Sequence, residues 1–145
     1  MYDAITIAEY LIGYSTSQGT PVSNLRLQKV LYFVQAEFMV SKGEPCFRDT
    51  IEAWDLGPVV PNVYREYKIF GASSIPVVAN NGDIRICADD ISIINDIVDG
   101  CNKYSTSTLV EFTHNQAPWV NAHSSQNSNV ITPESLRDFF EKEES

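Results

Sequence analysis

The chain has 145 residues, of which 43% are hydrophobic and 20% are charged, so we expect one ordinary globular domain spanning residues 1–145. The net charge of −9 disfavours nucleic-acid binding through phosphate neutralisation. We expect it to reflect an ordinary solvated acidic surface, and steering toward a basic partner is the alternative. The three cysteines include no Cys-x-x-Cys pair, and the N-terminus has no signal-peptide pattern. No apolar run approaches the roughly 18 residues that a membrane span needs. We therefore predict a cytoplasmic protein that has no membrane association.

Two helices are predicted in the first 45 residues. Residues 3–14 are predicted to form a helix with one apolar face, which Asp3 can cap. The next helix begins at Ser23 or Asn24 and ends near Gly43. It carries the clearest periodicity in the chain, a core-facing stripe of Leu27, Val30, Leu31, Val34 and Phe38. Lys29 lies in this helix. We expect the apolar stem of its side chain to extend far enough to place the ammonium group in solvent. An ion pair with Glu52 is the alternative.

The middle of the chain contains a strand pattern followed by a proline-rich bend. Residues 50–54 alternate as a strand does, and Pro58 keeps Gly57 out of the helical region. Pro61 fits the first turn of a helix that ends at Gly71. After a loop with a turn at residues 81–82, residues 84–86 predict a second strand. Pairing the two strands would give a small ribbon, which is stable only when it packs on helices.

The last third of the chain is predicted to be helical. A helix over residues 91–104 follows a cap at Asp89 or Asp90, and a short helix follows Ser107. Residues 113–122 look like a turn-rich segment. The final helix has the best start in the chain, with Thr132 as cap and Pro133 as first helical residue. The predicted fold class is therefore mainly α, a single compact helical domain with a small two-stranded β-ribbon.

Catalytic and metal-binding patterns are weak. Glu111 and His114 have the Glu-x-x-His spacing of one half of a di-iron site, but the other ligands are missing. No cysteine has a basic neighbour that would activate it, and the chain has neither a Gly-x-Ser-x-Gly elbow nor a phosphate-binding glycine loop. We therefore predict no enzyme activity, no metal and no cofactor. A hydrolase that uses His114 is a distant alternative.

Two tryptophans invite two interpretations. Trp54 and Trp119 each lie beside a proline-containing turn, and exposed aromatic side chains are common at binding hot spots. The alternative is that both rings close the core beneath irregular segments, which is the ordinary use of such large side chains. We expect the packing role for both, and for Tyr64 as well.

Four segments together resemble one protein family, the Panacea-domain antitoxins, also described as SocA-like or GepA-like. They are the Leu25–Phe33 helix, the Glu52–Tyr64 segment, Thr113-His114 with Pro118-Trp119, and the closing Ile131–Phe140 helix. The residues that match the family motif are Gln28, Lys29, Tyr32, Glu52, Trp54, Gly57, Pro58, Val59, Pro61, Tyr64, Thr113, His114, Pro118 and Trp119. The resemblance does not separate structural from partner-binding roles among them.

The resemblance implies an antitoxin that neutralises a cognate toxin protein by direct contact. In one branch of the family the domain is an adapter that delivers its toxin to a protease, and some members are phage-associated. A protease adapter or a phage-derived regulatory scaffold without a dedicated toxin is therefore the second hypothesis. The resemblance implies no catalytic residue. Many antitoxins carry a separate DNA-binding segment, and because this chain has no room for one, we expect no operator binding.

Overall fold

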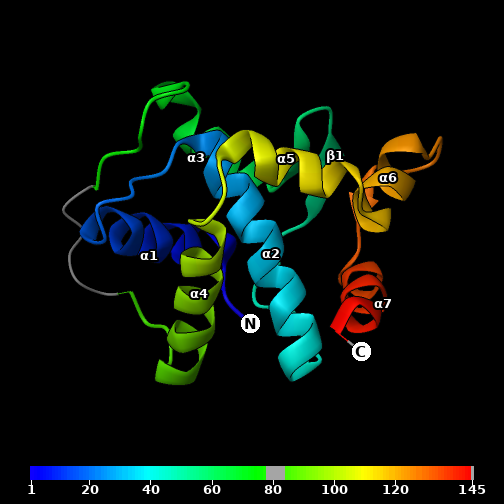
Figure 1. Cartoon of the computed structure of the whole chain (residues 1–145), viewed down its shortest axis with the longest axis horizontal. Helices are drawn as coiled ribbons and strands as arrows, with labels where there is room; N and C mark the ends of the chain where they lie inside the picture. Colours follow the sequence, from blue (N-terminus) through cyan, green and yellow to red (C-terminus); the bar gives the residue numbers. More distant parts are fainter. Residues whose placement is uncertain (78–83, 145) are drawn as a thin grey trace.

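A computed structural model describes residues 1–77 and 84–144, with side chains through residue 142. The elements are α1 (Ala4–Ser17), α2 (Asn24–Lys42), β1 (Ile51–Trp54), β2 (Gly57–Val59), α3 (Pro61–Tyr67), the 3-10 turn η1 (Lys68–Phe70), α4 (Ala88–Cys101), α5 (Thr106–His114), α6 (Ala117–Ser124), β3 (Val130–Ile131) and α7 (Pro133–Glu144). The mainly helical fold class with a small antiparallel sheet is confirmed (Figure 1).

The sheet has three strands in its described part, in the order β2-β1-β3. A two-residue turn at Asp55-Leu56 joins β1 to β2, and β3 pairs with the other edge of β1. The predicted pairing of β1 with residues 84–86 is wrong, because residues 84–87 form no strand. A short hairpin closes a smaller loop, at a lower entropic cost, than the distant segment would. The predicted turn at residues 81–82 lies outside the described residues.

Helix α2 is the centre of the molecule. It contacts α1, α3, α4, α5, α7 and β2, and α5 lies over its N-terminal part (Figure 1). The predicted stripe from Leu27 to Phe38 is buried, as expected. Helix α2 also buries the opposite side, however, including the polar side chains Gln28, Lys29 and Gln35. The apolar stripe predicted the helix but not its full enclosure.

Buried polar side chains of α2 serve as partners for backbone groups outside regular structure. The Oε1 atom of Gln35 accepts hydrogen bonds from the backbone amides of Cys46, at 2.8 Å, and Phe47, at 3.1 Å. The Nε2 atom of Gln35 donates to the backbone oxygen of Phe47 at 2.9 Å. Because a buried amide without partners is costly, these bonds make the enclosed position of Gln35 tolerable. They also hold the segment that leads from α2 to β1.

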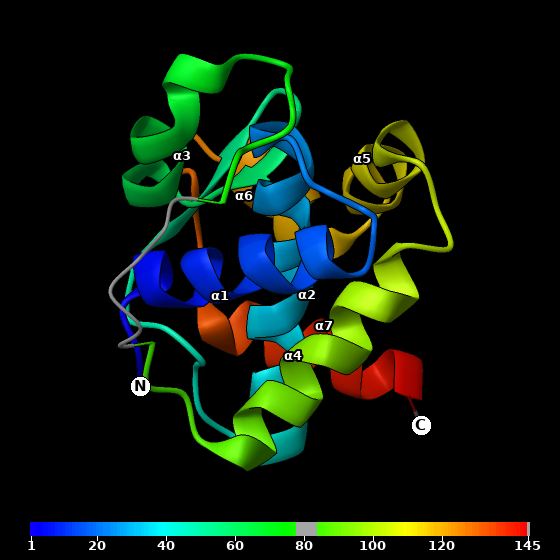
Figure 2. The same ribbon diagram turned by 90° about the vertical axis from the view of Figure 1, so that its left-hand side faces the viewer.

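Helices α1 and α4 lie beside α2 and contact each other (Figure 2). Asp3 stands at the N-cap position of α1, as predicted, but its side chain makes no cap hydrogen bond and contacts Arg48 instead. The cap is supplied from elsewhere in the chain, since the Ala4 amide donates to Oδ1 of Asp49 at 2.8 Å.

Three helix starts differ from the prediction. Helix α4 begins after Cys87, so Asp89 and Asp90 lie in its first turn, where a negative charge favours the helix dipole. Ser105, not Ser107, caps α5. The segment predicted to be turn-rich contains α6, whose Pro118 lies in the first turn, a position that needs no N–H donor.

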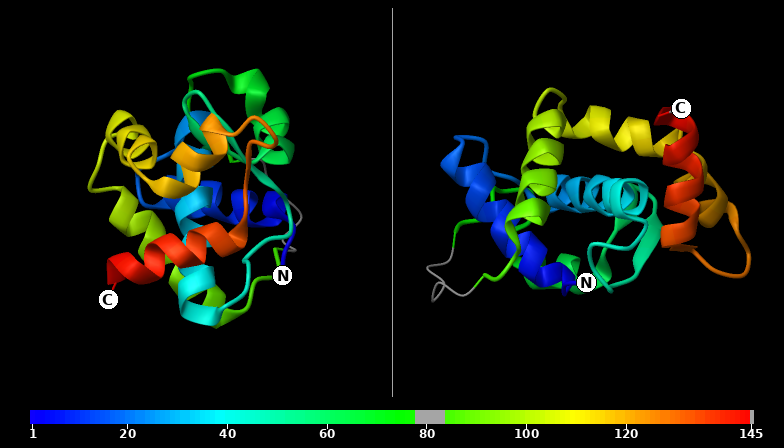
Figure 3. Two further views of the ribbon diagram at one scale, coloured as in Figure 1. Left: turned by 90° about the vertical axis from the view of Figure 1, so that its right-hand side faces the viewer. Right: turned by 90° about the horizontal axis from the view of Figure 1, so that it is seen from below.

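Helix α7 closes the molecule by lying across α2, next to α6 (Figure 3). Its start is as predicted: the Ser135 amide donates to Oγ1 of Thr132 at 3.2 Å, and the flanking Ile131 and Leu136 are both buried. Across the described ranges, no helix is both long and apolar enough to span a bilayer.

Candidate functional site

The hairpin formed by β1 and β2 is the meeting point of the residues singled out from the sequence. Gly57 ends its turn with a φ of 110°, a conformation that residues with a side chain rarely adopt. A Cβ atom at this position would lie 2.7 Å from Cε of Lys29 and 3.0 Å from Oγ1 of Thr113. Gly57 is therefore required both by its backbone geometry and by the close approach of α2 and α5.

Lys29 is fully buried beneath this hairpin. Its Nζ atom donates to the backbone oxygen of Pro58 at 2.9 Å, and burial lowers the pKa of the ammonium group to about 7. The prediction that Lys29 reaches the surface is wrong, because β2 and α5 close over the path that its stem would take. The alternative is not observed either. Glu52 accepts from Nε1 of Trp54 at 2.9 Å, and no ion pair joins it to Lys29.

Gln28 joins the hairpin to α3 through a chain of hydrogen bonds. The Val60 amide donates to Oε1 of Gln28 at 2.8 Å, and Nε2 of Gln28 donates to Oδ1 of Asn24 at 2.9 Å. Asn24 then donates from Nδ2 to the backbone oxygen of Tyr64 at 3.1 Å. Val60 is the N-cap residue of α3, which has Pro61 in its first turn. This series of hydrogen bonds therefore fixes the end of the sheet and the start of α3 to a single turn of α2.

Sequence reasoning missed Asn24 as a partner of Gln28. The spacing of four residues in a helix was a usable signal, because amide side chains at this separation face each other.

The remaining residues of β2 are buried. Pro58 and Val59 have little exposure, and β2 lies at the edge of the sheet, where the missing N–H of Pro58 removes no interior ladder bond. On the outer side of the hairpin, the half-buried rings of Trp54 and Tyr64 meet edge to face, with centroids 5.0 Å apart. Both rings pack within the fold, and each keeps part of its surface open to solvent.

Helices α5 and α6 hold the tip of the hairpin. Nε1 of Trp119 donates to the backbone oxygen of Trp54 at 2.9 Å. The Trp119 ring lies between the two histidines, 4.2 Å from the ring centroid of His114 and 4.3 Å from that of His123. Nε2 of His114 is 2.9 Å from the backbone oxygen of Asp55, and Nε2 of His123 is 2.9 Å from its Oδ1. Asp55 and His123 had no predicted role.

Three further motif residues support α5 and α6. Thr113 is buried, and its hydroxyl donates to the backbone oxygen of Val110 at 2.7 Å. Pro118 is buried in the first turn of α6. Tyr32 reaches from α2 to the loop between the two helices, where its hydroxyl donates to Oε1 of Gln116 at 2.8 Å. Burial raises the pKa of Tyr32.

The hypotheses of a metal site, a hydrolase that uses His114 and a cysteine nucleophile gain no support from the described residues. Among the described residues, no set of three or more His, Cys, Asp and Glu side chains is placed to hold a metal ion. His114 directs Nε2 at a backbone oxygen. Cys46 and Cys101 are buried, and burial raises the pKa of both thiols, that of Cys101 to about 11. Neither thiol is therefore activated as a nucleophile.

Comparisons with known proteins point in one direction. The family model described as "Antitoxin SocA-like, Panacea domain" matches residues 27–120, which run from α2 into α6. Antitoxin SocA of Caulobacter vibrioides (strain NA1000 / CB15N) is 34% identical over 131 residues, which cover 81% of this chain and 68% of that protein. No solved structure matches. The matched range contains the hairpin and most of the residues that hold it, whereas Asn24, His123 and strand β3 lie outside it.

Proposed function

Because the chain belongs to the family of SocA-like antitoxins with a Panacea domain, we propose that it neutralises a cognate toxin protein by binding it directly. The observation that carries this proposal is the extent of the similarity to Antitoxin SocA, which covers 81% of this chain.

The geometry of the hairpin supports a binding role without catalysis. Gln28, Lys29, His114 and Trp119 all direct their polar atoms at backbone groups or side chains of the chain itself. Such bonds keep the hairpin rigid, and a rigid surface loses less conformational entropy when a partner binds. We therefore assign these motif residues a structural role that supports a partner-binding surface.

Charge and cysteine chemistry agree with this proposal. A net charge of −9 attracts a basic partner over distances of about a Debye length, which raises the rate of encounter. Cys46, Cys87 and Cys101 are free thiols, as is usual in a reducing compartment. We place the complex of toxin and antitoxin in the cytoplasm.

Co-expression tests the proposal. Each small protein encoded beside this chain in its genome is expressed alone and with the chain, and growth and co-purification are measured. We expect one neighbour to arrest growth alone, and to be harmless and bound in the presence of the chain. Failure of both rescue and co-purification with every neighbour would refute the antitoxin function. A toxin whose amount falls when the chain is present would indicate delivery to a protease, the adapter alternative.

A further inference from the structure

A cleft of about 670 Å³ lies between the β1–β2 hairpin, the first turn of α2, and α3 with its extension η1. The hairpin contributes Trp54 and Leu56 to its walls, α2 contributes Leu25, and α3 and η1 contribute Tyr64 and Lys68. Every lining residue belongs to the described part of the chain. The volume is that of an ordinary ligand pocket, so there is room for one or two side chains of a partner.

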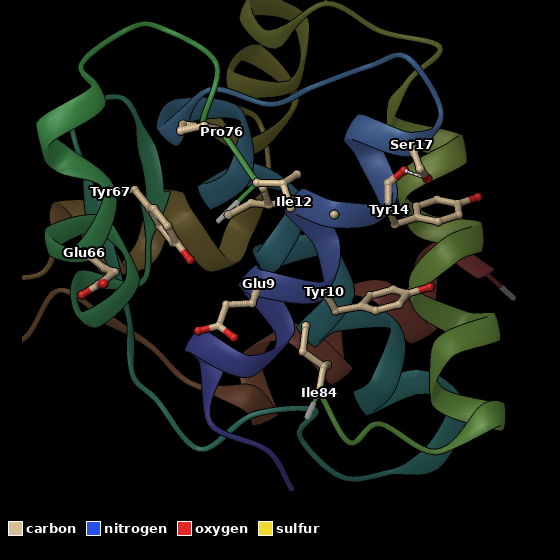
Figure 4. Close-up of a pocket in the computed structure, with 11 residues that line it drawn as sticks. Glu9, Tyr10, Ile12, Tyr14, Ser17, Glu66, Tyr67, Pro76 and Ile84 are labelled. Carbon is tan, nitrogen blue, oxygen red and sulfur yellow. Dashed lines mark hydrogen bonds between the residues drawn. The ribbon is translucent and has the colours of Figure 1, made fainter. Parts of the chain in front are cut away.

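This hairpin cleft is separate from the side of α3 that faces α1. Figure 4 shows Glu66 and Tyr67 of α3 on that side, where they line another hollow. The hollow and the hairpin cleft have no lining residue in common. In this part of the chain the cleft lining ends at Ala72, so it contains no residue that adjoins positions 78–83.

Leu56 is exposed at a turn whose backbone is held in place. Its exposed fraction is 60%, although turn positions usually carry Gly, Asn, Asp or Ser. Nε1 of Trp119 donates to the backbone oxygen of Trp54, and Nε2 of His114 lies 2.9 Å from the backbone oxygen of Asp55. One exposed leucine by itself needs no explanation, but this one borders a cleft and belongs to a turn held from two helices. A partner that contacts such a turn causes little loss of conformational entropy.

Trp54 and Tyr64 form an aromatic wall of the cleft. Their half-buried rings meet edge to face, with centroids 5.0 Å apart. The indole N–H of Trp54 already donates to Glu52, so this side chain has no donor left for a partner and offers only its apolar surface. Trp and Tyr are the aromatic side chains most enriched at binding hot spots, because a large ring buries much area with few rotatable bonds.

Two polar groups in the lining have no partner among the described residues. They are the hydroxyl of Tyr64 and the ammonium group of Lys68. The two residues are four positions apart in a continuous helical segment, so they lie on the same face of it. Asp55 is the one carboxylate in this described lining, and its Oδ1 atom is 2.9 Å from Nε2 of His123. Because a hydroxyl and an ammonium group can donate to one carboxylate, these groups favour an anionic acceptor from outside the chain.

We propose that the hairpin cleft receives an acidic side chain of the toxin together with an apolar side chain next to it. The proposal rests on the antitoxin function and specifies the surface of contact. The apolar side chain contacts Leu56 and Trp54, and the carboxylate accepts hydrogen bonds from Tyr64 and Lys68. The net charge of the whole chain attracts a basic protein at long range, whereas this contact is local and needs a single Asp or Glu of that protein.

Two exposed apolar residues provide a variant and its matched control. Leu56→Ser removes the apolar group at the cleft, and we expect the affinity for the toxin found by co-expression to fall by about tenfold or more. Ile69 is 86% exposed on η1 but does not line the cleft, so Ile69→Ser should stay within about twofold of the wild type. Both variants should keep the wild-type melting temperature, because neither side chain is buried. Equal affinities of the two variants would overturn the proposal.

A charge reversal tests the carboxylate. Lys68→Glu should lower the affinity by about tenfold or more, and exchange of one Asp or Glu of the toxin for lysine should restore it. Lys103→Glu makes the same change in net charge at an exposed position outside the cleft. We expect it to change the affinity by no more than about threefold. If no acidic residue of the toxin restores binding to the Lys68→Glu variant, the proposed carboxylate contact is wrong.

Hydrogen exchange of the wild-type chain locates the contact without any substitution. Bound toxin should slow the exchange of backbone amides in residues 53–57 and 64–72, and protection confined to other elements would contradict the proposal. A wild-type chain that binds no neighbouring protein would refute the antitoxin function, and this proposal with it. A wild-type chain that rescues growth, with Leu56→Ser and Lys68→Glu variants that bind the toxin equally well, would refute the cleft alone.

Discussion

Cε of Lys29 lies 2.7 Å from the position that a Cβ atom on residue 57 would occupy, so Lys29 and the missing side chain of Gly57 share one volume. Lys29 fills it from α2, and Gly57 leaves it free in the hairpin. The same lysine donates to the backbone oxygen of Pro58, one residue further on. The sheet can approach α2 this closely only because one residue is long and the other has no side chain.

Replacement of Gly57 by alanine should destabilise the fold. Gly57→Ala adds strain at a φ of 110° and a contact with Lys29, and together these should lower the free energy of unfolding by about 2–4 kcal/mol. Urea unfolding measures the change. Gly43→Ala is the control, since Gly43 also has a positive φ, of 71°, but has open space in place of a Cβ. Equal losses in the two variants would show that Lys29 moves aside without cost.

Lys29 should make stability depend on pH in the alkaline range. Its pKa in the folded chain is about 7, compared with an ordinary value of 10.5, so between these values the unfolded chain binds a proton that the folded chain does not. The free energy of unfolding should therefore rise with pH, by up to about 1.4 kcal/mol per unit, and level off above the unfolded pKa.

The Lys29→Met variant has a side chain of similar length and no amine to titrate, so it should lack this rise. Urea unfolding of both proteins between about pH 7 and pH 9 gives the difference in slope. A constant difference in stability across that range would mean that the folded chain keeps the lysine charged.

Loss of the Gln28 amide should cost more than the loss of one bond. Gln28→Leu leaves the Val60 amide and the Asn24 side chain without their partner inside the protein, and the free energy of unfolding should fall by about 2–4 kcal/mol. Thermal or urea unfolding checks this value. Gln18→Leu makes the same substitution at an exposed position and should stay within about 0.5 kcal/mol of the wild type.

Gly13→Ala should stabilise the isolated chain. The new methyl group meets open space, and alanine is the better helix former, so the free energy of unfolding should rise by about 0.5–1 kcal/mol. Gly100→Ala on α4 is a suitable comparison, because its Cβ would also meet nothing within 4 Å. Destabilisation at position 13 alone would show that its surroundings are already filled.

The chain should not bind duplex DNA from its own upstream region at physiological salt. Ten basic against nineteen acidic residues leave no net attraction for phosphates, and the affinity should be weaker than micromolar. Electrophoretic mobility and fluorescence anisotropy assays test this point. A sub-micromolar complex would contradict this prediction.

The features that the sequence predicted well are those whose signals are local. Ser23 caps the start of α2, Gly43 ends it, and Thr132 caps the start of α7. Each of these residues acts on the backbone within a few residues of itself. The stripe beginning at Leu27 predicted the core side of α2 for the same reason. These signals do not depend on what packs against the helix.

The features that were missed depend on distant parts of the chain. Lys29 is buried because a carbonyl group of β2 is there to accept its hydrogen bond, and nothing near it in α2 indicates that partner. The partners of β1 were missed because a hairpin and a two-residue strand from the far end compete with any other apolar segment. Pro118 suggested a turn, although a proline is equally at home in the first turn of α6. Motif residues were therefore found, but their contacts were not.

Strand β3 and helix α7 are synthesised after the other elements of this fold. Strand β3 covers the outer edge of β1, and Phe140 of α7 packs against Tyr32 and Phe33 of α2. Until residues 130–142 have left the ribosome, a sheet edge and the aromatic side of the central helix stay exposed, and such surfaces are prone to aggregation. A chain that stops before residue 130 would carry both features, by which chaperones and proteases recognise an unfinished protein.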